Sequence, residues 1–302
     1  MASSTGRRQR EAACVKVCML SLTCCAGCFL SFLSGGEDLY DFLTKDVQVV
    51  YSTTFVDTRE IPRVDLAIVE GGVRTEADEE LLREIRAKST TLVALGICAT
   101  HGGVTSLGNR LSLKKFLEQE FPRAQSSALP ELKDMMYPIC TFVDVDYYVP
   151  GCPPMPDRII KTLRSVVKGE KPERVKEVVC LECPRKILPV KPRRLYGTYE
   201  KEADINICLL SQGFICLGSL TRRGCGAPCP RVGFTCFGCR GPPDPLLYRS
   251  RDLFELLVNV TSKRTGISAE EVRKELYANP FVFHAFIFSK TLERFKAMER
   301  VI

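Results

Sequence analysis

The sequence predicts an α/β fold: a flavodoxin-like, doubly wound parallel sheet, then a small irregular domain and a helical C-terminal extension. Fully apolar runs alternate with helix-periodic segments over residues 14–168, as in parallel sheets that are covered on both faces. Residues 169–245 are dense in Cys, Gly and Pro, and residues 246–302 return to helical spacing. Residues 1–13 are expected to be a flexible N-terminus.

The first domain is expected to alternate strands and helices. Apolar and β-branched runs predict strands over residues 14–22, 47–51, 64–69, 91–97 and 142–149. Helical spacing predicts helices over residues 29–43 (with a break at Gly35-Gly36), 76–88 and 155–167. Acidic residues come early and basic residues late in the second of these helices, which suits the helix dipole.

The C-terminal extension is predicted to be helical over residues 252–260, 268–277 and 292–301. Ser268 is followed three positions later by Glu271, which is typical of a capping box at a helix start.

The cysteine content is the unusual feature of the composition. The chain has 302 residues with 16 Cys, 2 His and no Trp, and a chain of this length can fold without disulfide bonds. We recognise no secretory signal and no run of 18 apolar residues, so we expect a cytoplasmic protein without a membrane span. Many thiols and few His then indicate all-thiolate sites for zinc or iron–sulfur clusters.

Four cysteines follow predicted strands of the first domain. Cys25 and Cys28 follow the first strand, Cys98 follows the strand over residues 91–97, and Cys152 follows the last. The carboxyl ends of parallel strands meet at one edge of a sheet, so the four thiols are expected to converge. Neighbouring Gly and Pro residues let the backbone approach a bulky inorganic cluster.

The other cysteines of this domain are interpreted as small buried apolar residues. They are Cys14, Cys18, Cys24 and Cys140. Cys24 is the hardest to interpret, because it adjoins Cys25.

A second group of eight cysteines follows within sixty residues, which is enough for two four-cysteine sites. Its two- and three-residue gaps let neighbouring thiolates bind one centre, but this spacing does not separate zinc from iron–sulfur. The eight are Cys180, Cys183, Cys208, Cys216, Cys225, Cys229, Cys236 and Cys239.

Basic residues are concentrated between Asp157 and Arg194, with 12 Lys or Arg against 5 Asp or Glu, and this surplus equals the +7 of the whole chain. The segment is either a solvated linker or a docking surface for an acidic partner. No nucleic-acid motif accompanies it, so no nucleic-acid partner is expected.

Taken in order, the cysteine motifs resemble those of the small, iron–sulfur subunit of nickel–iron hydrogenases. The similarity is greatest to the gamma subunit of the cytoplasmic archaeal type, the methyl-viologen-reducing or F420-non-reducing hydrogenases. The matching segments are CCAGC at 24–28, VEGGV at 69–73, LVALGICATHGGV at 92–104, DYYVPGCPP at 146–154, CLECPRK at 180–186 and the run from 208 to 242.

The resemblance implies three 4Fe-4S clusters. It assigns Cys25, Cys28, Cys98 and Cys152 to a proximal cluster. It assigns Cys180, Cys183, Cys208 and Cys216 to a distal cluster, and Cys225, Cys229, Cys236 and Cys239 to a medial cluster. This division of the last eight rests on the resemblance, and an exchange of Cys216 with Cys225 is also compatible with the spacing.

The implied function is electron transfer within an oxidoreductase, with no catalytic residue in this chain. The nickel–iron centre would lie in a large subunit, because this chain lacks that subunit's paired CxxC motifs. The implied acceptors are an iron–sulfur adaptor with heterodisulfide reductase, a flavin subunit that reduces F420, or NAD(P). Glu70 is hypothesised to serve a proton route, with a backbone-bonded carboxylate as the alternative. His101 is expected at a helix N-terminus rather than as a ligand.

Two other functions are compatible with parts of the sequence. A complex-I-type electron-transfer subunit shares the predicted fold and a tandem Cys-Cys, but it needs only one cluster. A zinc-binding interaction protein would use the downstream cysteines without iron or sulfide.

Overall fold

The computed structural model describes residues 14–110, 113–121, 130–197, 199–243 and 253–278. Its centre is a five-stranded parallel sheet in the order β2-β1-β3-β5-β7, which confirms the predicted doubly wound fold. The strands are β1 (Val15–Ser21), β2 (Val47–Ser52), β3 (Val64–Glu70), β5 (Ser89–Leu95) and β7 (Tyr147–Val149).

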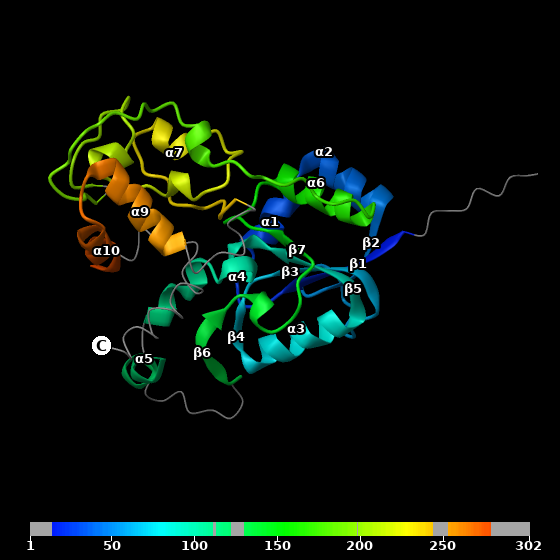
Figure 1. The fold of residues 1–302 in the computed structure, drawn as a ribbon. Helices are drawn as coiled ribbons and strands as arrows, with labels where there is room; N and C mark the ends of the chain where they lie inside the picture. The colour runs from blue at the N-terminus through cyan, green and yellow to red at the C-terminus, as the bar shows by residue number, and fades with distance from the viewer. Residues whose placement is uncertain (1–13, 111–112, 122–129, 198, 244–252, 279–302) are drawn as a thin grey trace, which may run out of the picture.

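Helices cover both faces of the sheet (Figure 1). On one face lie α1 (Gly27–Leu33), α2 (Gly36–Asp41) and α6 (Pro156–Val167), and on the other lies α3 (Glu76–Lys88). Side chains alternate along β1, so Val17 and Met19 pack toward the first group of helices, whereas Cys18 and Leu20 pack toward α3. This double burial explains why the strands read as continuous apolar runs.

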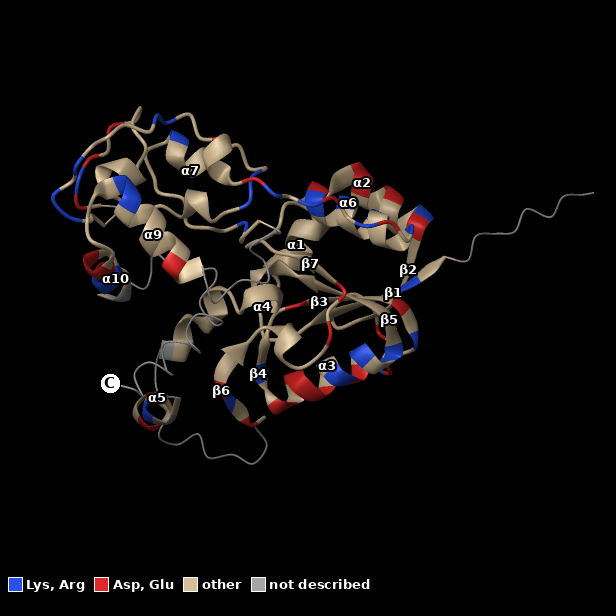
Figure 2. Cartoon of the chain, in the orientation of Figure 1, with Lys and Arg blue, Asp and Glu red and all other residues tan. Residues whose placement is uncertain are grey.

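The bounds of α3 are those expected from the sequence. Thr75 and Asp78 form a capping box at its start. Acidic residues fill its first turn and basic residues its last, a division that is visible in Figure 2.

Two expectations for the sheet were wrong. The strand predicted over residues 142–149 is reduced to β7, because Ile139–Thr141 form a 3-10 helix and Val143 and Val145 pack against the α3 side of the core instead of extending the strand. The strand expected over residues 91–97 ends at Leu95, and helix α4 (Gly96–His101) begins directly after it. The structure also contains an antiparallel pair that the sequence did not predict, β4 (Val73–Thr75) and β6 (Leu132–Tyr137).

The remaining described elements are helices. They are the π-helix Phe42–Asp46, the 3-10 helices Val104–Arg110, Val179–Leu181, Leu210–Gln212 and Leu217–Ser219, and the α-helices α5 (Leu113–Glu120), α7 (Pro228–Arg231), α9 (Leu253–Thr265) and α10 (Ala269–Ala278). Helix α9 extends beyond its predicted end, and the Ser268–Glu271 capping box of α10 is present. The helix predicted over residues 292–301 and the N-terminal residues 1–13 lie outside the described residues.

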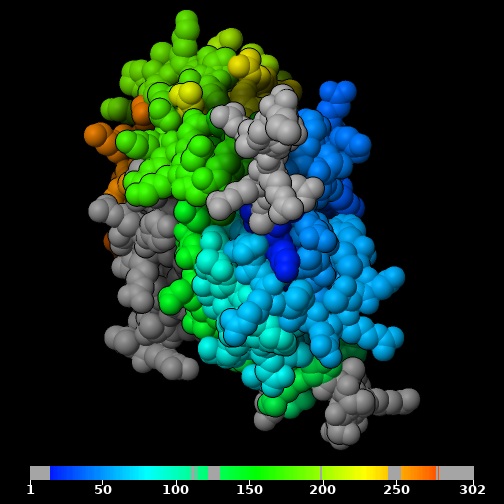
Figure 3. Space-filling model, turned by 90° about the vertical axis from the view of Figure 1, so that its right-hand side faces the viewer, coloured from blue at the N-terminus to red at the C-terminus, as the bar shows by residue number. Residues whose placement is uncertain are grey.

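The cysteine-rich segment forms a separate lobe beside the sheet domain (Figure 3). It holds 3-10 turns and isolated bridges, and its apolar core is shared with α9 and α10 through Leu217, Leu220, Leu257 and Val272. It approaches the carboxyl edge of the sheet at Gly241, where an added Cβ would lie 3.1 Å from Ile97 Cδ1. Within the described residues, no helix has the length and apolar character that a membrane crossing needs.

Candidate functional site

The first four cysteines lie at the carboxyl edge of the sheet. Cys25 precedes α1 and Cys28 is the second residue of that helix, while Cys98 is the third residue of α4 and Cys152 follows β7. Cys98 is therefore part of a helix and not of a loop after the strand. The reversal of strand order between β1 and β3 opens the sheet edge at this point, where doubly wound folds place their sites.

These four thiols are close enough to influence one another. The pKa of Cys28 is raised above its ordinary value mainly by burial, with further contributions from Glu70 and then from Cys98, Cys152 and Cys25. Burial, together with Cys98 and Cys25, raises the pKa of Cys152 to about 11. Thiolates are the ligands of iron–sulfur clusters, and a cationic centre would compensate their charge, so the donor set fits a thiolate-bound cluster.

Glycines leave room around these sulfurs. A Cβ added at Gly27 would lie 3.2 Å from Cys25 Sγ, and one added at Gly103 would lie 3.1 Å from Cys98 Sγ. A Cβ added at Gly96 would overlap Cys28 Sγ. The backbone therefore comes closer to the thiols than side-chain-bearing residues allow.

Glu70, the last residue of β3, is fully buried beside this group. Its carboxylate accepts hydrogen bonds from Ser21 Oγ at 2.8 Å and from the Phe29 amide at 3.1 Å. The backbone-bonded carboxylate that the sequence left as the alternative is therefore present, but at a strand end.

The other cysteines of the sheet domain differ from one another. Cys24 accepts a hydrogen bond from the Ala26 amide at 3.3 Å, and burial together with Glu70 raises its pKa to about 12. Cys18 is buried in β1 as expected and Cys140 is half-buried, but Cys14 is exposed because it precedes the strand. The expectation of burial was therefore wrong for Cys14.

His101 is the last residue of α4, so its expected place at a helix N-terminus was wrong. Helix α4 begins earlier, at Gly96, because β5 ends at Leu95. The ring is fully buried, and Nδ1 lies 2.8 Å from Thr100 Oγ1.

The eight downstream cysteines gather in two adjoining sets. Cys180 interacts with Cys208 and Cys183, and Cys216 interacts with Cys180 and Cys208. Burial is the main cause that raises the pKa of Cys180 and of Cys216 to about 12.

In the second set, Cys239 interacts electrostatically with Cys225 and Cys229, whereas Cys236 interacts first with Cys216 and less with Cys239, and it also acts on Cys180 of the first set. The two sets meet where the Cys236 amide donates to Cys216 Sγ at 3.3 Å. This second set also reaches the sheet edge, because Cys152 interacts with Cys239.

Sites made only of cysteine can hold a single ion or a cluster. Among the described residues, no group of three or more His, Cys, Asp or Glu side chains is arranged to hold one metal ion. A four-iron cluster is bound differently, because each thiolate takes a separate iron and the sulfurs need not converge on one point. The scarcity of His indicates all-thiolate donor sets, which suit iron–sulfur clusters and four-cysteine zinc sites alike.

Two charged residues of the CLECPR segment join the two downstream sets, and sequence reasoning missed both. The Glu182 carboxylate accepts hydrogen bonds from the amides of Gly224 at 2.8 Å and Gly226 at 3.0 Å, on either side of Cys225. Arg185 is buried and bonds to backbone carbonyls of neighbouring loops. The sequence signal that could have identified them is an acidic residue inside the CxxC motif and a basic residue two positions after it.

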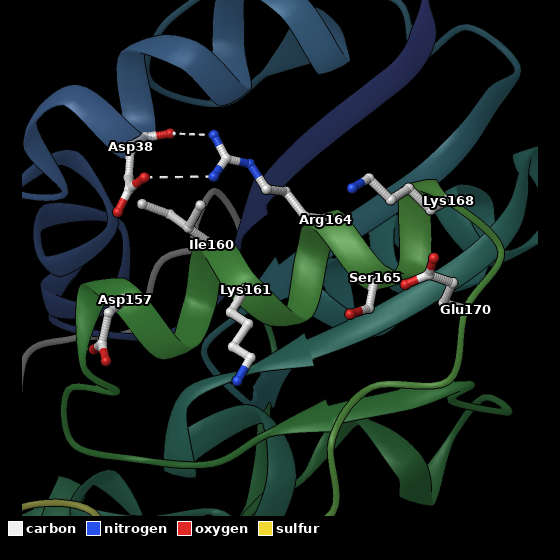
Figure 4. Close-up of a pocket in the computed structure, with 8 residues that line it drawn as sticks. All are labelled: Asp38, Asp157, Ile160, Lys161, Arg164, Ser165, Lys168 and Glu170. Carbon is white, nitrogen blue, oxygen red and sulfur yellow. Dashed lines mark hydrogen bonds and ion pairs between the residues drawn. The ribbon is translucent and has the colours of Figure 1, made fainter.

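A pocket of about 410 Å³ lies elsewhere, along α6 (Figure 4). Asp38, Lys161, Arg164 and Lys168 are among its lining residues, and Arg164 pairs with Asp38 and with Asp46 outside the pocket. Ion pairs thus neutralise part of the basic segment, and the pocket contains no cysteine.

Comparison with known proteins places this arrangement in a family. The sequence family described as the NADH ubiquinone oxidoreductase 20 kDa subunit matches residues 25–166. This range includes the first cysteine group but none of the eight downstream cysteines. A subunit of the vhu F420-non-reducing hydrogenase of Methanocaldococcus jannaschii is 39% identical over 254 residues, covering 81% of this chain and 88% of that protein. The chain belongs to the NiFe hydrogenase small-subunit family.

Other members of the hydrogenase small-subunit family agree. The iron-sulfur subunit of the F420-non-reducing hydrogenase of Archaeoglobus profundus is 31% identical, covering 76% of this chain and 83% of that protein. A chain of the NiFeSe hydrogenase of Desulfomicrobium baculatum superposes with a TM-score of 0.51 at 17% identity, covering 78% of this chain and 96% of the other. At that identity the superposition supports the fold alone.

Proposed function

We propose that this chain is the electron-transfer subunit of a NiFe hydrogenase and that it holds three 4Fe-4S clusters. The clusters would carry electrons released by H2 oxidation in a large subunit to a partner subunit. The observation that supports this most is the order in which the cysteine sets adjoin. The sheet-edge set meets the Cys239 set through Cys152, and that set meets the Cys180 set through Cys236 and Cys216. A medial site between two others is what sequential electron transfer requires.

The ligand roles follow this order. Cys25, Cys28, Cys98 and Cys152 would bind the proximal cluster, Cys225, Cys229, Cys236 and Cys239 the medial cluster, and Cys180, Cys183, Cys208 and Cys216 the distal cluster. When bound, the clusters supply the one-electron redox chemistry. The chain supplies the thiolates, the burial and the hydrogen bonds that set the potentials.

Metal and sulfide analysis tests this proposal. Anaerobically purified protein is expected to contain about twelve irons and about as many acid-labile sulfides per chain. About four irons would favour a complex-I-type subunit with one cluster. Zinc without sulfide would favour a zinc-binding interaction protein and contradict electron transfer.

The large subunit is proposed to dock beside the proximal site. Four large apolar side chains are exposed there, on α1 or beside it: Leu30 at 63%, Leu33, Phe55 and Met155. Phe55 contacts Phe29 edge to face at 6.3 Å, and α1 is bound to the segment before Met155 through Ser31 Oγ and Pro154 O. Exposed apolar surface of this kind is typical of a permanent subunit interface.

The electron acceptor is proposed to dock near the distal motif. Leu181, between two proposed distal ligands, is 68% exposed, and Lys186, Lys191 and Arg193 are exposed on the same segment. The family resemblance implies an iron–sulfur adaptor with heterodisulfide reductase, or a flavin subunit. Reconstituted electron transfer is expected to slow as salt rises, and independence from salt would contradict a basic docking surface.

Glu70 is proposed to serve a proton route near the proximal site. It is a fully buried carboxylate, and its charge affects both Cys28 and Cys98. Glu70→Gln is expected to retain iron but to slow proton release during H2 oxidation, whereas unchanged proton release would contradict the route.

A further inference from the structure

Arg185 is a buried cation in the cysteine-rich lobe. Its side chain is only 6% exposed. Nε donates to the Pro230 carbonyl at 2.6 Å, and Nη1 donates to the carbonyls of Ile207 at 3.0 Å and Asp204. The planar guanidinium is therefore held in one orientation by three backbone acceptors.

These contacts place Arg185 between two proposed clusters. It follows Cys183 by two residues, Ile207 directly precedes Cys208, and Pro230 directly follows Cys229. One guanidinium therefore connects two distal ligand segments with a medial one.

The charge of Arg185 has no acidic partner among the described residues, and within that part of the chain Nη2 is buried without a hydrogen-bond partner. Nη2 lies 3.9 Å from the position of an added Cβ at Gly233, within the loop between Cys229 and Cys236. A buried guanidinium with an unused donor is costly unless negative charge lies nearby. Clusters bound by four thiolates each would supply that charge.

We propose that Arg185 stabilises the reduced state of the distal and medial clusters and so raises their reduction potentials. The inference rests on the proposed function. Reduction adds a negative charge to a cluster, and a fixed positive charge in a low-dielectric interior favours that addition. Arg185 thus acts as a positioning and tuning residue on the electron path, and it also ties the ligand loops together.

An EPR-monitored redox titration of the anaerobic holoenzyme tests this role. Arg185→Met is expected to lower the ratio of reduced to oxidised distal and medial clusters about tenfold at a fixed potential, which is about 59 mV for a one-electron couple. Arg185→Lys keeps the charge and is expected to stay near the wild-type potential. Arg223→Met is the matched control, because Arg223 is 49% exposed and faces Glu177 at 4.0 Å. The proximal cluster should not shift in any variant.

Each outcome decides the question. Unchanged reduction potentials in an Arg185→Met protein with its full iron content would show that Arg185 only holds the backbone of the loops. That result would overturn the proposal. If Arg185→Met and Arg185→Gln lose iron while Arg185→Lys keeps it, the buried charge is required and the proposal stands. Iron loss in all three variants would assign Arg185 to loop structure alone and overturn it. Absence of iron and sulfide from the wild type would instead reject the proposed function.

Discussion

The sulfur atom of Cys28 occupies the place that a Cβ atom on Gly96 would need. Gly96 begins α4 directly after β5 and has a φ of +82°, a backbone conformation that favours glycine. The close approach of these two residues brings the start of α1 against the start of α4. The Cys25–Cys28 motif can therefore share one site with Cys98.

Gly96→Ala is expected to remove the proximal cluster and leave the other two. The new methyl group would displace Cys28 Sγ, so iron should fall from about twelve to about eight per chain. The control is Gly169→Ala, at a φ of +71° with nothing within 4 Å of an added Cβ. It carries a similar backbone penalty of about 1–2 kcal/mol but should retain all iron. Full iron in Gly96→Ala would contradict the proximal assignment.

Alanine variants of the tandem cysteines are expected to differ. Cys25 lies close enough to Cys28, Cys98 and Cys152 to contribute to their raised pKa values. Cys24 interacts electrostatically with Glu70 and Cys25 instead. Cys25→Ala should therefore lose about four irons and Cys24→Ala should keep them. Iron analysis and EPR of the proximal signal measure this, and the opposite pattern would make Cys24 the ligand.

Neutralising Glu182 is expected to loosen the segment around Cys225. Its carboxylate accepts two charge-assisted hydrogen bonds, and an amide in its place accepts them more weakly. In Glu182→Gln, amide exchange at Gly224 and Gly226 should accelerate about tenfold, equivalent to about 1.4 kcal/mol. Glu177→Gln, at an exposed pair with Arg223, is the control for charge removal. Equal exchange in both variants would show that Glu182 does not hold this segment.

Lys133→Met is expected to destabilise the sheet domain by about 1 kcal/mol at neutral pH. Lys133 joins β6 to α3 through Glu76 at 2.7 Å and Glu79 at 2.6 Å. Hydrogen bonds from Lys133 and Arg83 lower the pKa of Glu79, and hydrogen bonds to Glu76 and Glu79 raise the pKa of Lys133.

The pH dependence of this destabilisation follows from the directions in which the pKa values of Glu79 and Lys133 are shifted. The contribution of Glu79 to the free energy of unfolding is complete above the ordinary carboxyl pKa near 4.5. It is lost as pH falls through the lowered pKa of the folded state. The Lys133 contribution is complete below its ordinary pKa of 10.5 and is lost as pH rises through its raised value. Urea unfolding of variant and wild type at each pH measures the difference, which should shrink in acid.

The control is Lys45→Met, at an exposed helical pair with Asp41, which should change stability by less than about 0.5 kcal/mol. A difference that persists below the folded-state pKa of Glu79 would contradict this account.

The pattern of apolar residues predicted the strands and helices of the sheet domain well where buried positions recur at regular intervals. β1 and β3 are apolar over consecutive positions because both of their faces are covered, and α3 has a capping box and a charge gradient within its own sequence. The end of β5 could not be predicted in this way. Ile97 is as apolar as a strand residue, but the chain turns into α4 at Gly96 to present Cys98 at the sheet edge.

Cysteine type and spacing, taken alone, determined that this protein has enough thiols for three four-cysteine sites, and motif order determined the family resemblance. Only the tertiary structure shows which thiols lie near one another: Cys216 lies near Cys180, Cys208 and Cys236, and Cys239 lies near Cys225 and Cys229. It also decided that Glu182 and Arg185 act across loops rather than toward solvent. The physical reason is that local patterns encode burial and helix or strand formation, whereas contacts between irregular loops depend on how the whole chain packs.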